Sequence, residues 1–286
     1  MKTIGVLANC RKPGAPAMLR RLANRAAALG MQLVACDETA RAMPGVKRVT
    51  AKAFAKHIDV LLAMGGDGTM LKAVRLLGGS DKPVLGVNLG SLGFLTSVTE
   101  ERLEKALEVL RKGNYTVSKR TMIECRVSRG ARRVGSYRAL NDVVIGWGMS
   151  SRVITLELAV DREPVASYVC DGLIVSTPTG STGHSLSASG PILHPASPSF
   201  VVSLICPHTL SNRPLVISDR SAVRVRVVRA QKKILLSVDG QEERWVGQGD
   251  RIEVRRSPRT ARFIHLPGYS YFSVLRQKLH WRGSNV

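Results

Sequence analysis

Acidic residues are scarce in this sequence. Its 286 residues include 21 Asp and Glu against 43 Lys and Arg, which gives a formal net charge of +22 at pH 7. A chain this basic suggests an anionic partner, such as nucleic acid, a membrane surface or a phosphorylated small molecule. Aromatic residues make up only 5% of the chain, which weakens the case for a platform that stacks single-stranded bases.

Long apolar runs and paired cysteines are also missing. No apolar run reaches the roughly 18 residues of a spanning helix, so we expect no membrane partner. The first ten residues are too weakly apolar for a signal peptide and are better interpreted as a strand. The five cysteines are widely spaced and the six histidines lack metal-ligand spacing, which argues against a disulfide framework and a structural zinc site. We therefore expect a cytoplasmic protein with no metal-binding cluster of its own.

The excess positive charge is concentrated in two stretches. Residues 119–138 contain seven basic residues and one acidic residue, and residues 220–286 contain fifteen and five. Together they account for 16 of the 22 excess charges. A solvated, strand-rich surface is one interpretation, and nucleic-acid binding is the alternative on charge alone.

Apolar patterning predicts two domains. In the first third, expected strands at 4–8, 31–35, 58–64 and 83–87 alternate with expected helices at 16–29, 70–77 and 100–112. This alternation predicts an α/β domain with a parallel sheet over residues 1–113.

The pattern changes after Gly113, which we expect to end a helix. Residues 114–268 are β-rich, and their expected strands include 134–145, 251–254 and 262–266. They predict a mainly β C-terminal domain. The last segment, 269–286, returns to helical spacing and is predicted to rejoin the first domain.

A glycine-rich loop follows the expected strand at 58–64. Its residues are Gly65, Gly66, Asp67, Gly68 and Thr69. Glycines at the carboxyl end of a strand let backbone N–H groups approach a phosphate, and the next helix offers its N-terminus to an anion. Asp67 would repel a phosphate, so we interpret it as a base or a metal contact, with a capping residue of a tight turn as the structural alternative.

Three further motifs contain polar or glycine-rich loops. The loop 88–96 contains Asn88 and Phe94, and Asn141-Asp142 precede a strand, where they are able to bind a ribose diol or simply form a turn. The segment 171–191 is rich in Ser, Thr and Gly and is better interpreted as a shaped binding loop than as a flexible linker.

Taken together, these motifs resemble the NAD kinase family. The resemblance rests on residues 65–69, 88–96, 141–142, 171–191 and the segment Cys206–Pro214, which occur in the family's order. It implies transfer of the γ-phosphoryl group of ATP to the 2′-hydroxyl of the adenosine ribose of NAD, with Mg²⁺ or another divalent cation. It also implies a homodimer or homotetramer with NAD and ATP as partners, and makes nucleic-acid binding an unexpected property.

The resemblance also implies roles for particular residues. Asp67 is the expected catalytic residue. The expected phosphate loop comprises Gly65, Gly66, Gly68 and Thr69. The expected NAD-binding residues are Asp67, Gly68, Lys72, Asn88, Phe94, Asn141, Asp142, Arg152, Asp171, Thr182, Gly183, His184, Ser185, Leu186, Ser187 and Gln241.

Two positions depart from the family's pattern. Asp142 stands where the family has Glu, so the carboxylate reaches less far. His184 stands where the family commonly has Tyr, and we expect its ring to replace the stacking of that Tyr with less area.

Two alternative functions stay open at this stage. Lipid kinases of the diacylglycerol or sphingosine type have a similar glycine loop, although the segment 171–191 and Leu71-Lys72 disfavour them. A basic nucleic-acid-binding protein would instead show steep salt dependence of binding.

Overall fold

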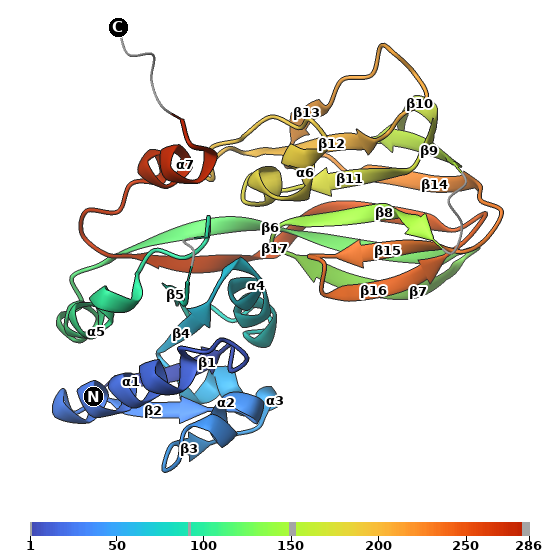
Figure 1. Cartoon of the computed structure of the whole chain (residues 1–286). Coiled ribbons are helices and arrows are strands. Elements are labelled where there is room, and N and C mark those ends of the chain that lie inside the picture. The colour runs from blue at the N-terminus through green and yellow to red at the C-terminus, as the bar shows by residue number, and fades with distance from the viewer. Residues whose placement is uncertain (1, 91–92, 149–152, 282–286) are drawn as a thin grey trace, which may run out of the picture. The chain divides into compact units, whose positions relative to one another are not determined.

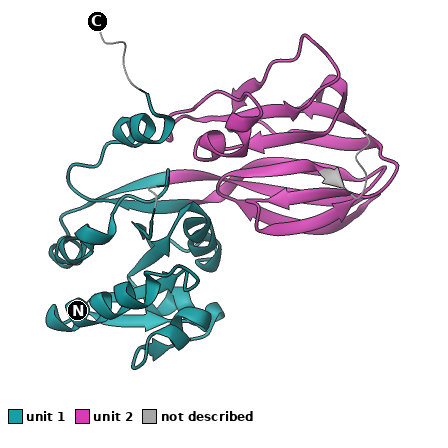
Figure 2. Ribbon diagram, viewed as in Figure 1, with its two compact units in different colours: residues 1–119, 261–286 teal, residues 120–260 magenta. Residues whose placement is uncertain are grey.

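The computed structural model describes residues 2–90, 93–148 and 153–281. It divides into two compact units, one of residues 1–119 with 261–286 and one of residues 120–260 (Figure 2). Two long strands, labelled β6 (Thr116–Arg129) and β17 (Arg251–His265) in Figure 1, contribute residues to both units, which Figure 2 shows in different colours.

A parallel sheet forms the centre of the first unit. Its strands run in the order β5-β4-β1-β2-β3, and every neighbouring pair is parallel. The bounds are β1 Thr3–Ala8, β2 Gln32–Ala35, β3 Lys47–Arg48, β4 Val60–Gly65 and β5 Val84–Asn88. The strands β4 and β5 are buried along their whole length, as expected for a sheet covered by helices. The predicted α/β domain with a parallel sheet is therefore confirmed.

Helices connect these strands. They are α1 (Ala15–Ala28), α2 (Asp37–Ala42), α3 (Ala51–Phe54) with η1 (Ala55–His57), α4 (Asp67–Leu76), and η2 (Glu100–Arg102) with α5 (Leu103–Lys112). Apolar side chains of α1 and α5 enter one buried cluster with the sheet, including Leu22 and Leu107. Gly113 has a φ of 76°, which suits a glycine that ends α5, as the sequence predicts. The chain's last described helix, α7 (Tyr271–Leu279), also belongs to this unit.

The second unit consists mainly of two sheets. One contains residues of β6 and β17 together with β7 (Arg132–Ala139), β9 (Ile154–Val160), β10 (Glu163–Cys170) and β14 (Val223–Arg229). The other has the order β13-β12-β11-β8-β15-β16. Its bounds are β8 Asp142–Gly148, β11 Gly172–Ser176, β12 Ser199–Ile205, β13 Leu215–Ser218, β15 Ile234–Val238 and β16 Glu242–Val246. Two short helices, η3 (Gly180–Thr182) and α6 (His184–Ser187), follow β11.

Alternating side chains build the core of the second unit. In β14 the valines at 223, 225 and 227 are buried while the intervening arginines reach solvent. These valines join Ile145, Leu173 and Phe200 of the other sheet in one buried cluster. The predicted mainly β C-terminal domain is confirmed.

Three predicted boundaries were wrong. The single strand predicted at 134–145 is two strands, because the chain passes from one sheet to the other at residues 140–141. The separate strands predicted at 251–254 and 262–266 form one continuous strand, β17, whose partners change along its length. Helix α4 begins at Asp67, three residues before the predicted start, because residues 67–69 of the glycine loop form the first turn of the helix. Among the described residues, no helix is long and apolar enough to cross a bilayer.

Candidate active-site residues

The glycine loop and the loop 88–96 begin at the same edge of the first unit's sheet. Strands β4 and β5 are parallel neighbours, and their last residues, Gly65 and Asn88, are register partners. A side chain at Gly65 would not fit, because a Cβ atom there would lie 2.1 Å from Oγ1 of Thr69. The close packing of strand end and helix start therefore needs glycine at this position.

The Asp67 carboxylate joins the two loops. Its Oδ2 accepts a hydrogen bond from the backbone N–H of Phe94 and its Oδ1 one from Leu95, both at 2.9 Å. A Cβ atom at Gly93 would lie 2.0 Å from Oδ1 of Asp67, so glycine is needed for this contact. Asp67 also stands in the first turn of α4, where the helix dipole favours negative charge. The carboxylate is therefore held in one orientation by main-chain donors.

A basic hollow of about 460 Å³ adjoins this loop, and we call it the glycine-loop hollow. Gly66, Gly68, Thr69 and Lys72 line it, together with residues that the sequence analysis missed. These additional residues are Ala8, Asn9, Arg11, Lys12 and Glu38. Residues 9–12 follow β1 directly, and β1 lies next to β4, so their position after a predicted strand was a usable signal. The cations here suit an anionic ligand, as the glycine loop predicts.

Two expected residues of the loop 88–96 have structural contacts. Asn88 is buried, and its side-chain Nδ2 donates to the carbonyl oxygen of Gly90 in its own loop. Phe94 is half-buried, and Nζ of Lys278 lies 5.8 Å from the centre of its ring. The residues 91 and 92 of this loop lie outside the described residues.

In the second unit, Asn141 and Asp142 line a hollow of about 340 Å³ with His184, and we call it the Asp142 hollow. Asp239, which the sequence analysis missed, fixes the chain here. Its carboxylate accepts backbone N–H bonds from Leu140 at 2.8 Å, Asn141 at 2.7 Å and Asp142 at 3.2 Å. Nothing in the local sequence links residues almost a hundred positions apart, so only the fold reveals this anchor.

The polar side chains of this hollow are perturbed by burial. Burial first, and the nearby Asp239 second, raise the pKa of Asp142 to about 7. The Oδ1 atom of Asn141 is buried and has no hydrogen-bond partner in the structure. An acceptor without a donor inside a hollow is costly, and a ligand donor would satisfy it.

The segment after β11 folds tightly against Asn141. A Cβ atom at Gly180 would lie 2.2 Å from the Asn141 carbonyl oxygen, so only glycine fits there. The shaped loop predicted from sequence matches these contacts. Ser185 is fully buried, and its Oγ shares a hydrogen bond of 3.3 Å with Oγ of Ser203.

The remaining expected residues lie in different places. Asp171 directly precedes β11, and Asp142 is the register partner of Ser176 at the other end of that strand. The two acids are therefore separated by the length of β11. Gln241 follows Asp239 and Gly240 in the turn between β15 and β16. Arg152 lies outside the described residues. Gly183 lies close to Asn141. Thr182 is the last residue of η3, and Leu186 and Ser187 belong to α6.

Within residues 2–90, 93–148 and 153–281, no group of three or more His, Cys, Asp or Glu side chains is arranged to hold a metal ion. All five cysteines are free. Burial raises the pKa of the Cys125 thiol to about 12.

The fold places a glycine loop at the carboxyl edge of a parallel sheet, and comparisons with known proteins assign the chain to a class of enzymes, the kinases, which are phosphotransferases. Residues 4–115 match the family described as the ATP-NAD kinase N-terminal domain, and residues 140–266 match the ATP-NAD kinase C-terminal domain. The chain belongs to the ATP-NAD kinase family.

Individual relatives support the same assignment. The NAD kinase of Syntrophotalea carbinolica is 39% identical over 282 residues, covering 98% of this chain and 99% of its own. The NAD kinase of Geobacter metallireducens is 45% identical over 237 residues, covering 83% of this chain and 84% of its own. These relatives leave the lipid-kinase and nucleic-acid-binding alternatives without support.

Solved structures confirm the fold. Yeast NADH kinase complexed with NADH matches with a TM-score of 0.90 at 23% identity, covering 100% of this chain and 89% of its own. An NAD kinase from Archaeoglobus fulgidus in complex with ATP matches with a TM-score of 0.76 at 24% identity, covering 98% and 100%.

Proposed function

We propose that this protein transfers the γ-phosphoryl group of ATP to the 2′-hydroxyl of the adenosine ribose of NAD. The observation that carries the proposal is the Asp67 carboxylate, which two main-chain donors hold and whose chain neighbours Gly66 and Gly68 line the glycine-loop hollow. The family assignment and the named relatives support the same substrates.

Asp67 would act on the acceptor hydroxyl. A carboxylate has about four lone-pair sites, and the N–H groups of Phe94 and Leu95 occupy two of them. The remaining sites are able to accept the proton of the 2′-hydroxyl as it attacks. Because the two donors fix the carboxylate, little orientation remains to be lost in the transition state.

The cations of the glycine-loop hollow would bind the phosphates of a substrate. Arg11, Lys12 and Lys72 line it, and their charges would offset the repulsion between an anionic nucleotide and the carboxylate of Glu38, which lines the same hollow. Phosphoryl transfer depends mainly on positioning and charge stabilisation, which these groups supply.

The Asp142 hollow would bind part of NAD. The free Oδ1 acceptor of Asn141 and the carboxyl group of Asp142 match the donor hydroxyls of a ribose. His184 lines the same hollow and presents a ring for stacking. The shorter Asp142 and the smaller His184, relative to the family's usual Glu and Tyr, fit a pocket that binds NAD with fewer contacts.

The donor set fits a divalent cation that arrives with ATP. Mg²⁺ in nucleotide sites is held by one or two carboxylates with substrate phosphates and water. Asp67 adjoins and Glu38 lines the glycine-loop hollow, and these are the residues that would contact it. When bound, Mg²⁺ would neutralise charge on the ATP phosphates. We propose it as the cofactor, with no other tightly bound group.

The variant Asp67→Asn tests the proposal. We expect kcat for NADP formation to fall by about a hundredfold or more, because a general base commonly contributes 10² to 10⁴, with little change in KM for NAD. The assay couples NADP to an NADP-dependent dehydrogenase and compares NAD with NADH and ATP with polyphosphate. Asp81→Asn, at an exposed acid of the same unit, is the matched control. Near wild-type turnover of Asp67→Asn would remove Asp67 from the mechanism, and absence of NADP formation by the wild type would refute the function.

We further propose a homodimeric or homotetrameric cytoplasmic enzyme. The five free cysteines support a reducing compartment. Sedimentation velocity on the full chain measures the oligomeric state, and a monomer at all concentrations would contradict this proposal.

A further inference from the structure

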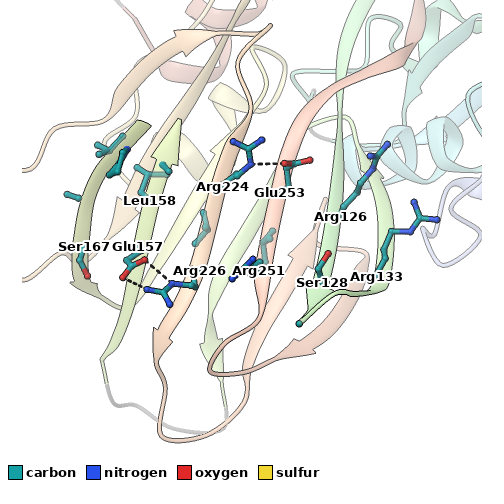
Figure 3. A pocket seen from close by; sticks show the side chains of 17 residues that line it. Arg126, Ser128, Arg133, Glu157, Leu158, Ser167, Arg224, Arg226, Arg251 and Glu253 are labelled. Atoms are coloured by element: carbon teal, nitrogen blue, oxygen red, sulfur yellow. Dashed lines mark hydrogen bonds and ion pairs between the residues drawn. The ribbon is translucent and has the colours of Figure 1, made fainter. Parts of the chain in front are cut away.

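A second basic hollow lies on the outer face of a sheet in the unit of residues 120–260 (Figure 3). Its volume is about 950 Å³, and it shares no residue with the hollows described above. We call it the sheet hollow. Its charged lining residues are Arg126, Arg133, Arg224, Arg226, Arg251, Glu157 and Glu253. Both stretches that concentrate the chain's positive charge contribute to it.

The two acids of the sheet hollow are already paired. Glu157 accepts hydrogen bonds from Nε and Nη2 of Arg226 at 2.9 and 2.6 Å, and Glu253 accepts one from Nε of Arg224 at 2.8 Å. The hydrogen bond from Arg226 lowers the pKa of Glu157, so this acid stays ionised at neutral pH. Five arginines against two acids leave a net charge of +3 in the lining.

Two arginines of the lining face each other across neighbouring strands. Arg226 of β14 and Arg251 of β17 are register partners across the antiparallel ladder, where opposite residues have Cβ atoms roughly 5 Å apart and like charges destabilise the sheet. In the described part of the chain, the side chains of Arg251 and Arg133 have neither an ion pair nor a hydrogen bond. An anion between these guanidinium groups would relieve the repulsion.

One further arginine of the lining has a buried donor without a partner. The Nη1 atom of Arg224 is buried and has no hydrogen-bond partner, although its Nε binds Glu253. A buried donor without an acceptor is destabilising.

One side of the sheet hollow is apolar. Pro164, Val165 and Ala166 of the edge strand β10 line it, and Val165 is 40% exposed. A ligand that matches the hollow therefore combines a multiply charged anionic end with a flat apolar end. A volume of 950 Å³ is at the upper end of ordinary small-molecule sites of about 300–1,000 Å³.

We propose that the sheet hollow binds a nucleoside triphosphate, with its phosphates on Arg133, Arg226 and Arg251 and its base over Pro164–Ala166. Guanidinium groups bind phosphate oxygens in pairs, which suits a chain of phosphates better than single carboxylates. The proposal is independent of the proposed function, because the two involve different residues.

Calorimetric titration of ATP into the full chain tests it. The variant R133A/R251A removes two guanidinium groups that form no ion pair or hydrogen bond with the described residues, so the fold should persist, which thermal unfolding checks. R132A/R229A is the matched control, since these exposed arginines of β7 and β14 lie outside the hollow and the change in charge is equal. The wild type and the control should bind one more ATP per chain than R133A/R251A, in which we expect at least a tenfold loss at this site.

Inorganic triphosphate is the second probe. It should displace the additional ATP from the wild type but bind more weakly, because it lacks the base. Equal affinity for both probes would overturn the assignment of a nucleotide, and equal loss in the two double variants would reduce the effect to overall charge. Displacement of ATP by much tighter RNA binding would make nucleic acid the occupant. A changed sedimentation coefficient of R133A/R251A with unchanged ATP stoichiometry would make the surface a contact between copies of the chain. Each of the last four results would refute the proposal.

Discussion

Replacing Asp142 by asparagine should stabilise the protein above neutral pH and leave it unchanged in acid. Asp142 is 6% exposed, and its pKa is raised from 3.8 to about 7 by burial and by the charge of Asp239. The folded protein therefore retains the proton of Asp142 at pH values where the unfolded chain has released it. Stability is greatest below about pH 4 and decreases as the pH rises to about 7, where the decrease ends.

The size of this effect follows from the shift. About three pH units correspond to on the order of 4 kcal/mol, since one unit corresponds to about 1.4 kcal/mol. Asparagine has the same shape and no ionised form, so Asp142→Asn should avoid this cost. The difference in unfolding free energy between variant and wild type should increase from near zero at about pH 4 to a few kcal/mol at about pH 8.

Urea unfolding at several pH values measures this difference. Asp81→Asn serves as the control, because Asp81 is an exposed acid whose loss should give a small difference at every pH. A difference for Asp142→Asn that is the same at both ends of the pH range would refute the argument. So would a variant that is less stable than wild type at about pH 8.

Three further results are expected. Gly180→Ala should destabilise the protein by about 1–3 kcal/mol in urea unfolding, because the added Cβ atom would lie 2.2 Å from the Asn141 carbonyl oxygen. The control Gly247→Ala should be nearly neutral, because a Cβ atom there would have no neighbour within 4 Å. His184→Ala should raise KM for NAD and His184→Tyr should lower it or leave it unchanged; if neither variant changes KM, the ring does not stack on NAD. Lys72→Met should raise KM for ATP or NAD in the coupled assay without lowering the thermal unfolding midpoint, and an unchanged KM would exclude a phosphate contact.

Local patterning was enough to predict much of the fold. Buried apolar runs separated by amphipathic helices are typical of a covered parallel sheet, so β1, β4 and β5 were predictable. The glycine loop was predictable as well, because three glycines directly after a strand end are typical of a turn that approaches a ligand closely. The pair Asn141-Asp142, which often forms a turn, was a signal for the break at residues 140–141, but no local pattern shows that the chain changes sheets there.

Contacts between distant residues could not be read from the sequence. The anchoring of residues 140–142 by Asp239 depends on the pairing of β8 with β15, which no local pattern encodes. The orientation of Asp67 depends in the same way on backbone N–H groups 27 and 28 residues away. Charge counts located the basic stretches, but only the register of β14 and β17 shows that Arg226 and Arg251 face each other.

The contact between Asp67 and the loop 88–96 has a consequence for sequence variation. Because the donors are the main-chain N–H groups of Phe94 and Leu95, their side chains are irrelevant to the bond. Every amino acid except proline supplies the same donor. A library randomised at positions 94 and 95 should therefore tolerate many residues with respect to this bond and exclude proline at both positions, whereas position 93 should accept glycine alone.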